Sequence, residues 1–359
     1  MIPYYSTYIL IIFCNYISKT ATPDSKKQRS LFCAFSFIII TALLSLRHQT
    51  MGIDLWGGNS KEHIGYLGAF EHLNRYSWAQ LLSLKSYLNY EYGYIIFNKL
   101  VGGIYNNKQF FLCICAIISI APIMIYINKK STQTLLSVFI FLGLPVFLLL
   151  FSGLRQALAI SITVYSVKYI EDKKIVKFIL TVLFATLFHY SSIIFLISYP
   201  LYYLRLSKVK KLLSVIFIPI IYILKAPLFL VLSKLFSNSA KITETGAVTL
   251  FIVFFLIYVF LIFFNKEQDE HINGIINLFY MACICQAFGG VYQLAMRVGY
   301  YFMIYATIAI PNTINSMNDK KSSKLLNILI FAAFVGFGIY SLRNSTWAMT
   351  YPYKFYWKK

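Results

Sequence analysis

The sequence predicts an all-α protein, a polytopic bundle of about 10–12 transmembrane helices with one long extracytoplasmic loop. Of its 359 residues, 59% are apolar and 13% are charged, and the mean hydropathy of +0.67 exceeds that of an ordinary soluble domain. Apolar runs that could cross ~30 Å of hydrocarbon as a helix of about 20 residues recur along the whole chain. These observations exclude a soluble enzyme and predict a single integral membrane domain over residues 1–359.

Twelve apolar stretches are expected to span the membrane. They cover residues 2–17, 31–46, 109–127, 134–150, 154–170, 174–189, 190–204, 212–230, 247–264, 272–292, 296–312 and 324–342. Residues 174–203 could form one long tilted helix or two short helices that break near His189, and Lys225 and Pro227 interrupt the eighth span. The first stretch lacks a basic region and a cleavage site, so we expect it to be an anchor.

The 33 basic and 12 acidic residues give a net charge of +21, and the basic residues indicate the orientation of the chain. They form short clusters between apolar runs and no basic face with interleaved aromatics, so we expect no nucleic-acid partner. The proposed threading puts the main clusters on one side, which the positive-inside rule assigns to the cytoplasm. These clusters are residues 26–29, 129–130, 173–174, 205–211 and 320–321.

The longest polar stretch, residues 47–107, lies outside in this threading. It contains four acidic residues, Asp54, Glu62, Glu71 and Glu91, together with two Trp and several Tyr residues. Amphipathic pieces such as residues 78–88 predict short helices along the outer interface. A loop of this length is typical of a functional segment, although a plain extracytoplasmic decoration would have a similar composition.

Six cysteines all fall within apolar stretches. They are Cys14, Cys33, Cys113, Cys115, Cys283 and Cys285. Their positions match neither a disulfide framework nor a zinc motif, so we expect them to be small core residues.

Arg155 and Gln156 lie in an apolar run of more than 30 residues. Gly153, Ala157 and Ser161 form a stripe of small residues that predicts close helix packing there. A charged side chain inside such a run usually faces a cavity or a partner. The alternative is an arginine that snorkels to the outer headgroups.

Three other charged or titratable residues lie at the expected outer ends of spans. His189 has an imidazole that titrates near neutral pH, so it could act as a general base or serve as a packing residue. Arg297 precedes Val298-Gly299-Tyr300-Tyr301 and would be a second buried arginine. Arg47 ends the second span and leads into Gly52-Ile53-Asp54, although an arginine at an interface is common.

Arg47, Asp54, Glu91, Arg155, His189 and Arg297 come from separate segments, yet the threading puts all six at the outer boundary. Guanidinium groups bind phosphate oxygens in a bidentate manner. The set therefore indicates a site for a phosphorylated lipid headgroup. The acidic residues between 54 and 91 could instead hold a divalent cation, but no spacing marks a metal site.

Several motifs resemble those of the EpsG-type polysaccharide polymerases, relatives of the bacterial Wzy O-antigen polymerases, over most of the chain. They are Arg47…Gly52-Ile53-Asp54, followed by Tyr66; Glu91-Tyr92-Gly93-Tyr94 with Phe97 and Asn98; Ser152-Gly153-Leu154-Arg155-Gln156-Ala157; Tyr169-Ile170…Lys173-Lys174; Leu187-Phe188-His189-Tyr190-Ser191-Ser192; and Arg297-Val298-Gly299-Tyr300-Tyr301.

The resemblance implies a GT-C-like glycosyltransferase of the bacterial inner membrane with its active site on the periplasmic side. Such an enzyme moves a growing glycan from undecaprenyl pyrophosphate to an incoming lipid-linked repeat unit. His189 is the first choice for the base, with Asp54 and Glu91 as alternatives. The implied contacts to pyrophosphate or glycan are Arg155, Gln156, Arg297, Arg47 and Tyr301. No metal cofactor is expected, and membrane lipids and a chain-length regulator are candidate partners.

Three alternative functions stay open. An O-antigen ligase-like glycosyltransferase would use the same residue types with another acceptor. A flippase or transporter of lipid-linked oligosaccharides would show two related halves and polar residues near the bilayer midplane, and neither is evident in the sequence. A non-catalytic scaffold would tolerate replacement of Arg155 and His189.

Overall fold

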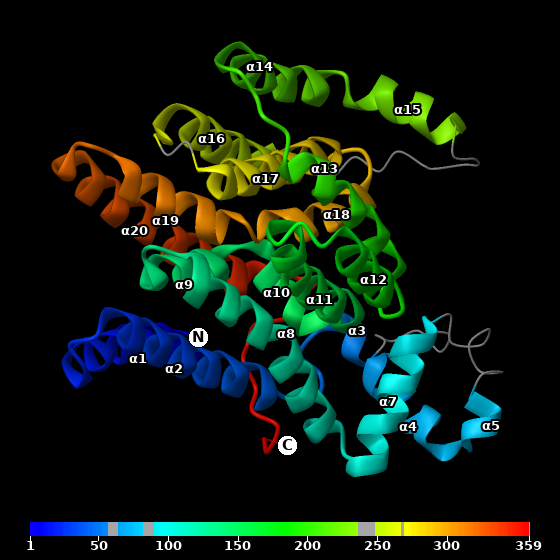
Figure 1. The fold of residues 1–359 in the computed structure, drawn as a ribbon. Helices are drawn as coiled ribbons and strands as arrows, with labels where there is room; N and C mark the ends of the chain where they lie inside the picture. Colours follow the sequence, from blue (N-terminus) through cyan, green and yellow to red (C-terminus); the bar gives the residue numbers. More distant parts are fainter. Residues whose placement is uncertain (57–63, 82–89, 236–247, 267–268, 359) are drawn as a thin grey trace. The chain divides into compact units, whose positions relative to one another are not determined.

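The computed structural model describes residues 1–56, 64–81, 90–235, 248–266 and 269–358, and these residues form an all-α structure (Figure 1). Within these ranges there is no strand, and an isolated bridge between Arg47 and Phe355 is the one β-type pairing. The predicted fold class, an all-α polytopic helical protein, is confirmed. The chain divides into two compact units, Met1–Ile193 with Ile330–Lys359, and Ile194–Leu329. That residues 1–359 form one membrane domain stays a prediction.

The first unit contains the helices that carry most of the predicted site. They are α1 (Ile2–Ala21), α2 (Ser25–Ser45), α3 (Ile53–Trp56), α4 (Tyr66–Arg75), α5 (Trp78–Leu81), α7 (Tyr92–Ile104), α8 (Lys108–Lys130), α9 (Thr134–Gly143), α10 (Pro145–Ser152), α11 (Leu154–Glu171) and α12 (Ile175–Thr186). The 3₁₀ helix η2 (Tyr190–Ile197) begins in this unit, and residues 330–344 of α20 (Lys320–Asn344) belong to it.

The second unit contains the remaining helices. They are α13 (Ser198–Tyr202), α14 (Lys208–Ile223), α15 (Lys225–Leu235), α16 (Val248–Phe264), α17 (Glu270–Phe288), α18 (Gln293–Met303), α19 (Ala306–Ser316) and the first part of α20.

Four described helices, α2, α8, α17 and α20, are long and apolar enough to cross a membrane. Three bent pairs, α9 with α10, α14 with α15 and α18 with α19, raise this number to seven if each pair is one span. The chain is therefore a multi-pass membrane protein. The other expected spans also contain helices, but these helices are shorter or less apolar than those seven. The count of 10–12 spans therefore stays a prediction.

Several expected spans are broken by their local sequence. Residues 174–203 form two short pieces, since α12 ends at Thr186 and η2 begins at Tyr190. The span expected at 212–230 bends by 79° beside Lys225. The continuous spans expected at 134–150 and 296–312 are wrong in detail, because they bend by 60° and 50°. In the first of these, Pro145 starts a new helix, since proline cannot donate a backbone hydrogen bond and fits the first helical turn.

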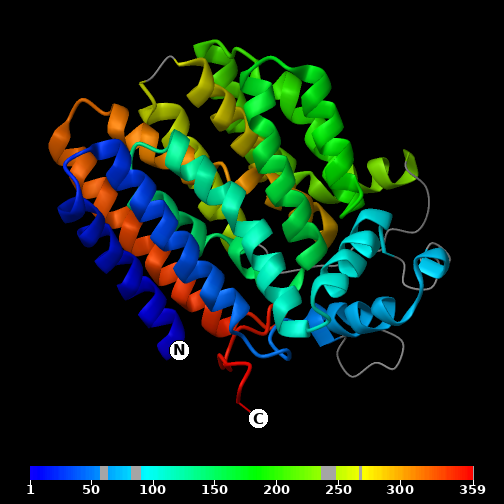
Figure 2. The ribbon, with the colours of Figure 1, turned by 60° about the horizontal axis from the view of Figure 1, so that its bottom comes forward.

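The stripe of small residues brings α11 close to α8. Ala157 and Ser161 are buried, and Oγ of Ser161 donates a hydrogen bond of 2.7 Å to the carbonyl of Ile118. Gly153 does not belong to this packed face, because it forms the break between α10 and α11. Figure 2 shows α8 and α11 side by side in the first unit.

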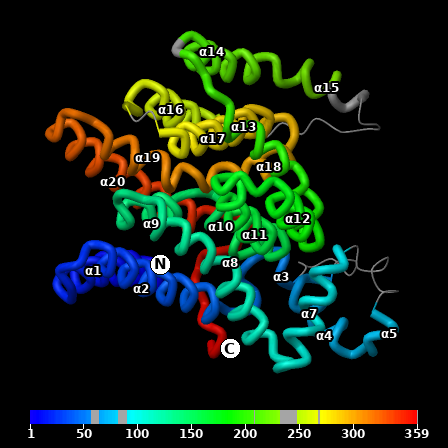
Figure 3. The backbone as a smooth tube through the Cα atoms, viewed as in Figure 1, coloured from blue at the N-terminus to red at the C-terminus, as the bar shows by residue number. Residues whose placement is uncertain are grey.

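The C-terminal segment of the first unit runs back along the end of α2, as the tube in Figure 3 shows. The N–H of His48 donates to the carbonyl of Lys354 (2.8 Å), and the N–H of Tyr356 donates to the carbonyl of Leu46 (2.9 Å). The hydroxyl of Tyr353 donates to the carbonyl of Leu43 (2.7 Å). Residues 350–356 therefore hold the chain just before the Gly52-Ile53-Asp54 motif.

All six cysteines are free thiols. Cys33, Cys115, Cys283 and Cys285 are buried, and Cys14 and Cys113 are half-buried. The buried four fit the prediction of small core residues.

Candidate active site

Four of the sequence motifs meet in the first unit, although they are far apart along the chain. They contribute residues 52–55, 91–94, 152–155 and 187–190. Each motif lies where a helix begins or ends, so its polar side chains can turn away from the apolar helix faces.

Gly52 allows the first motif to lie against the break between α10 and α11. Its φ of +105° disfavours any residue with a side chain, and an added Cβ would lie 1.9 Å from the carbonyl oxygen of Phe151. Two residues later, the N–H of Asp54 donates to Oγ of Ser152 (3.2 Å). Asp54 is therefore anchored to Ser152, which precedes Arg155 by three residues in the chain.

Gly93 allows the start of α7 to lie against the end of α12. An added Cβ would lie 2.6 Å from the Cβ of Leu187 and 2.7 Å from its carbonyl oxygen. That same carbonyl accepts a hydrogen bond of 3.1 Å from the N–H of Tyr94. This contact brings Glu91 next to His189.

The Glu91 carboxylate is the centre of the cluster. Its Oε2 accepts a hydrogen bond from Nη1 of Arg155 (2.7 Å), and its Oε1 accepts one from the N–H of Tyr190 (3.1 Å). Nδ1 of His189 lies 3.4 Å from the same Oε1. Glu91 precedes the first residue of α7 but makes no capping bond to that helix, so its carboxylate serves these other partners.

The surroundings of Glu91 stabilise its ionised form. Burial alone would raise the pKa of this carboxyl, but the adjacent His189 side chain, the charge of Arg155 and backbone donors lower the pKa to about 2. Glu91 is therefore an anion at neutral pH. A carboxylate that holds its proton so weakly is a poor general base, so the geometry favours Glu91 as a group that orients its neighbours.

Arg155 is held in one orientation by aromatic side chains. Its Nε donates to the hydroxyl of Tyr66 (3.3 Å), and its guanidinium carbon lies 4.5 Å from the ring centre of Tyr90 and 5.7 Å from that of Tyr66. Its side chain is 20% exposed. Among the described residues, the hydrogen bonds of this guanidinium come from Nε and Nη1.

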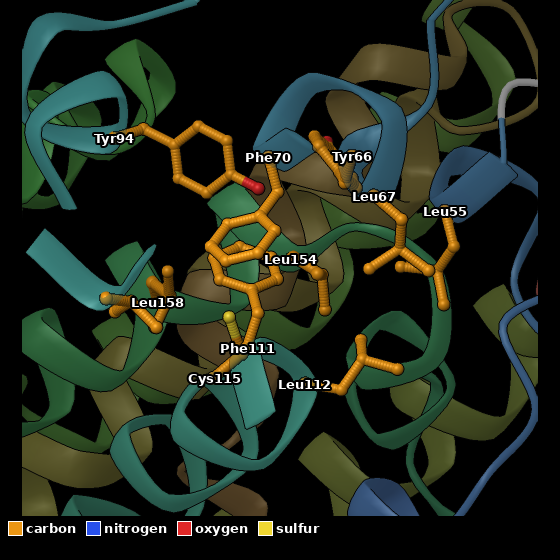
Figure 4. Packing of buried hydrophobic residues seen from close by; sticks show 11 residues of the cluster. Leu55, Tyr66, Leu67, Phe70, Tyr94, Phe111, Leu112, Cys115, Leu154 and Leu158 are labelled. Atoms are coloured by element: carbon orange, nitrogen blue, oxygen red, sulfur yellow. The ribbon is translucent and has the colours of Figure 1, made fainter. Parts of the chain in front are cut away.

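A buried apolar cluster lies next to these residues in the first unit, and Figure 4 shows its side chains. Phe70 of α4 stacks on Phe111 of α8 with ring centres 4.6 Å apart, and Leu154, next to Arg155, belongs to the same cluster. Tyr66 and Tyr94 join it at the edge nearest the site. Packed side chains restrict the motion of the polar groups that they carry.

The structure buries Arg47 and Gln156 in the first unit and places Arg297 and Tyr301 in the second unit. Arg47 is 1% exposed and donates to the carbonyls of Leu44 (2.9 Å) and Phe151 (3.5 Å), so it ties the end of α2 to the end of α10. Gln156 is 3% exposed on α11. Arg297 and the fully buried Tyr301 lie on α18 in the second unit. Their roles as substrate contacts stay predictions.

Sequence reasoning did not assign Tyr90, Ser152 or the N–H of Tyr190 to the site. Tyr90 precedes Glu91 and Tyr190 follows His189, so their adjacency to predicted residues was a usable signal. Ser152 lies three residues before Arg155, but only its contact with Asp54 reveals its part in the site.

The described residues contain no group of three His, Cys, Asp or Glu side chains that could hold a metal ion. Glu62, one of the acidic residues considered for a cation, lies outside the described residues, as does most of the amphipathic piece 78–88. Glu71 forms an ion pair of 2.8 Å with Lys108. Both oxygens of Glu91 already have partners in the cluster.

Comparison with known proteins gives one match to a family model, described as the EpsG family, which covers residues 30–355. No curated protein matches the chain. No solved structure matches it either, so its GT-C likeness stays a prediction. Because the matched region contains all four motifs and nearly the whole chain, this protein belongs to the EpsG family.

Proposed function

We propose that this protein is a polysaccharide polymerase that uses lipid-linked substrates. It would transfer a growing glycan from undecaprenyl pyrophosphate to the terminal sugar of an incoming lipid-linked repeat unit, at the periplasmic face of the bacterial inner membrane. Membership of the EpsG family supports a polysaccharide polymerase-like role in general. The observation that carries the proposal is the Glu91 carboxylate that contacts both Arg155 and His189.

The reaction forms a glycosidic bond and releases undecaprenyl pyrophosphate. The acceptor hydroxyl oxygen attacks the anomeric carbon of the donor sugar, and the bond from that carbon to the phosphate oxygen breaks. The pyrophosphate keeps the electron pair of that bond, and its growing negative charge needs a cation. Arg155 supplies this cation. Its Nη2 can bond a phosphate oxygen while Nη1 stays on Glu91.

The acceptor hydroxyl must lose its proton to a base. Nδ1 of His189 lies 3.4 Å from Oε1 of Glu91, so in the proposed reaction a proton on Nδ1 would face the carboxylate and Nε2 would accept the proton of the hydroxyl. Glu91 would then stabilise the imidazolium that forms, as a carboxylate does beside a catalytic histidine. We therefore assign His189 as the base and Glu91 as a positioning residue. Asp54 remains the alternative base.

A complementation experiment tests the proposal. Cells that lack the protein receive the wild type, Arg155→Ala, Arg155→Lys, His189→Ala or the control Arg75→Ala, and their surface glycan is resolved on a gel. Arg75 is an exposed arginine on α4, the helix that carries Tyr66. We expect a ladder of repeat units with the wild type and the control, and a single capped unit with Arg155→Ala and His189→Ala. Arg155→Lys should stay poor, because an ammonium group does not replace a planar guanidinium.

Two outcomes would contradict the proposal. Loss of even the single capped unit in the null strain would point to a flippase or a ligase. An unchanged ladder with Arg155→Ala at normal protein level would exclude the assigned role of Arg155. Immunoblots of the membrane fraction control for insertion of each variant.

A further inference from the structure

The second unit contains a cavity of about 910 Å³ that the proposed function does not use. It lies where α13 ends, α14 begins, α16 ends and α17 begins, helices that pack together within this unit (Figure 1). Both polar and apolar side chains line it. Such a cavity suits an amphipathic ligand.

Positive charge dominates the polar wall. Arg205, Lys211 and Lys266 line the cavity together with one acidic residue, Glu270. Nη2 of Arg205 lies 3.2 Å from Oε1 of Glu270, and Nζ of Lys211 lies 3.1 Å from Oδ1 of Asn273. Among the lining residues that the structure describes, three are cationic and one is anionic, so positive charge is in excess there.

The apolar wall is exposed next to these cations. Leu204, Leu212 and Phe263 all line the cavity with a large exposed surface. Three exposed apolar side chains beside three cations match the junction between the headgroup and the chains of a lipid.

The basic residues also indicate the membrane side. Arg205 and Lys211 belong to the basic stretch 205–211, which the charge distribution of the sequence assigns to the cytoplasm. Anionic lipids in the cytoplasmic leaflet bind basic pockets between transmembrane helices.

We propose that this cavity binds the phosphate headgroup of an anionic membrane lipid in the cytoplasmic leaflet. Arg205, Lys211 and Lys266 bind the phosphate, and the apolar wall contacts the start of the acyl chains. The cavity shares no residue with the site formed by Glu91, Arg155 and His189. Lipid binding to the cavity can therefore be measured without a polymerisation assay.

Native mass spectrometry of the full-length protein with phosphatidylglycerol or phosphatidylcholine measures the binding. We expect preferential binding of phosphatidylglycerol. Arg205→Gln and Lys266→Gln should each lower its affinity about fivefold, the equivalent of about 1 kcal/mol per cation. Both side chains are exposed, so these changes put little of the fold at risk. Lys211→Arg should keep the affinity, because it keeps the charge.

Glu270→Gln gives a test of opposite sign. It removes the acidic residue in the lining and should raise the affinity for phosphatidylglycerol about fivefold, which a merely structural role would not predict. The matched control is Lys26→Gln with Lys27→Gln, two exposed lysines of the first unit on the same expected side of the membrane.

Three results would overturn the proposal. Equal binding of the two lipids would remove the headgroup selectivity. An equal loss in the Lys26 and Lys27 variant would mean a general effect of surface charge. Displacement of phosphatidylglycerol by excess inorganic phosphate would assign the cavity to a soluble anion and not to a lipid.

Discussion

Glu91 joins the two residues that the chemistry requires, because one of its oxygens contacts Arg155 and the other lies near His189. The sequence offered Glu91 as an alternative base, and the structure suits it better to an orienting role. The difference comes from its surroundings, since cationic and hydrogen-bonding neighbours stabilise the carboxylate more than burial destabilises it.

His189→Gln tests the base at the scale of one residue. The amide keeps a polar side chain but cannot accept a proton, so we expect kcat to fall by about 10²–10⁴-fold with little change in binding of the lipid-linked donor. Turnover and donor binding measured on the purified protein separate the two effects. Equal losses in both would make His189 a binding residue.

Glu91→Gln tests the ionised carboxylate through stability. We expect the variant to be about 2 kcal/mol less stable at pH 7, because the charged hydrogen bonds to Arg155 and Tyr190 weaken. The folded-state pKa of about 2 lies below the ordinary value of 4.5, so the carboxylate's contribution is present above pH 4.5 and is lost as the pH falls toward 2.

Thermal unfolding of both proteins in detergent between pH 7 and pH 3 measures this dependence. The difference in unfolding temperature between the wild type and Glu91→Gln should become smaller as the pH falls. A difference in unfolding temperature that stays constant over this pH range would mean that the Glu91 side chain stabilises the fold by its shape alone.

At the scale of helices, the site depends on close approach between chain segments. The start of α7 lies against the end of α12, and Gly93 leaves the space that this contact needs. The break between α12 and η2 in turn lets His189 face Glu91, which a continuous helix through residues 174–203 would alter.

Gly93→Ala tests that approach, and Gly103→Ala in the same helix is its matched control. An added methyl at Gly93 overlaps Leu187, whereas at Gly103 it meets nothing within 4 Å. We expect Gly93→Ala to lower both stability and polymer formation, since overpacking costs about 1–3 kcal/mol. Gly103→Ala should be neutral or stabilising by up to about 1 kcal/mol, because alanine favours the helix.

Thermal unfolding and the glycan ladder measure both glycine variants. If Gly93→Ala behaves like Gly103→Ala, the contact between α7 and Leu187 is not needed for the site.

At the scale of the whole molecule, the C-terminal segment reaches the region of the first motif. Residues 350–356 bond to the end of α2, and the hydroxyl of Tyr4 bonds to the carbonyl of Thr350, so both ends of the chain meet in the first unit. Arg47 pairs with Phe355 of this segment, and its buried guanidinium bonds two carbonyl groups.

Truncation after Asn344 tests this arrangement. We expect lower thermal stability and loss of the glycan ladder, because the backbone bonds to Leu46 and His48 and the bridge to Arg47 are removed. Removal of Lys358 and Lys359 alone is the control and should change neither. A full ladder from the longer truncation would show that the C-terminal segment does not support the site.

Local patterns along the chain were enough to predict the helical membrane class, the positions of most helices and the residue types of the site. Hydropathy, short basic clusters and proline or glycine breaks are local signals, so they can be read along one chain. The threading also grouped Arg47, Asp54, Glu91, Arg155, His189 and Arg297 at one boundary, and three of these six, Glu91, Arg155 and His189, meet in the first unit.

Which of these groups touch, and what each can do, depends on how the helices pack. Glu91 lies 64 residues from Arg155 along the chain, and Tyr190 lies 99 residues from Glu91, so their contacts depend on how α4, α7, α11 and α12 pack. The same packing buried Arg47 against carbonyl groups, stacked Tyr90 on Arg155 and lowered the pKa of Glu91. Burial and electrostatic environment arise from neighbours that are distant in sequence, and local patterns do not specify them.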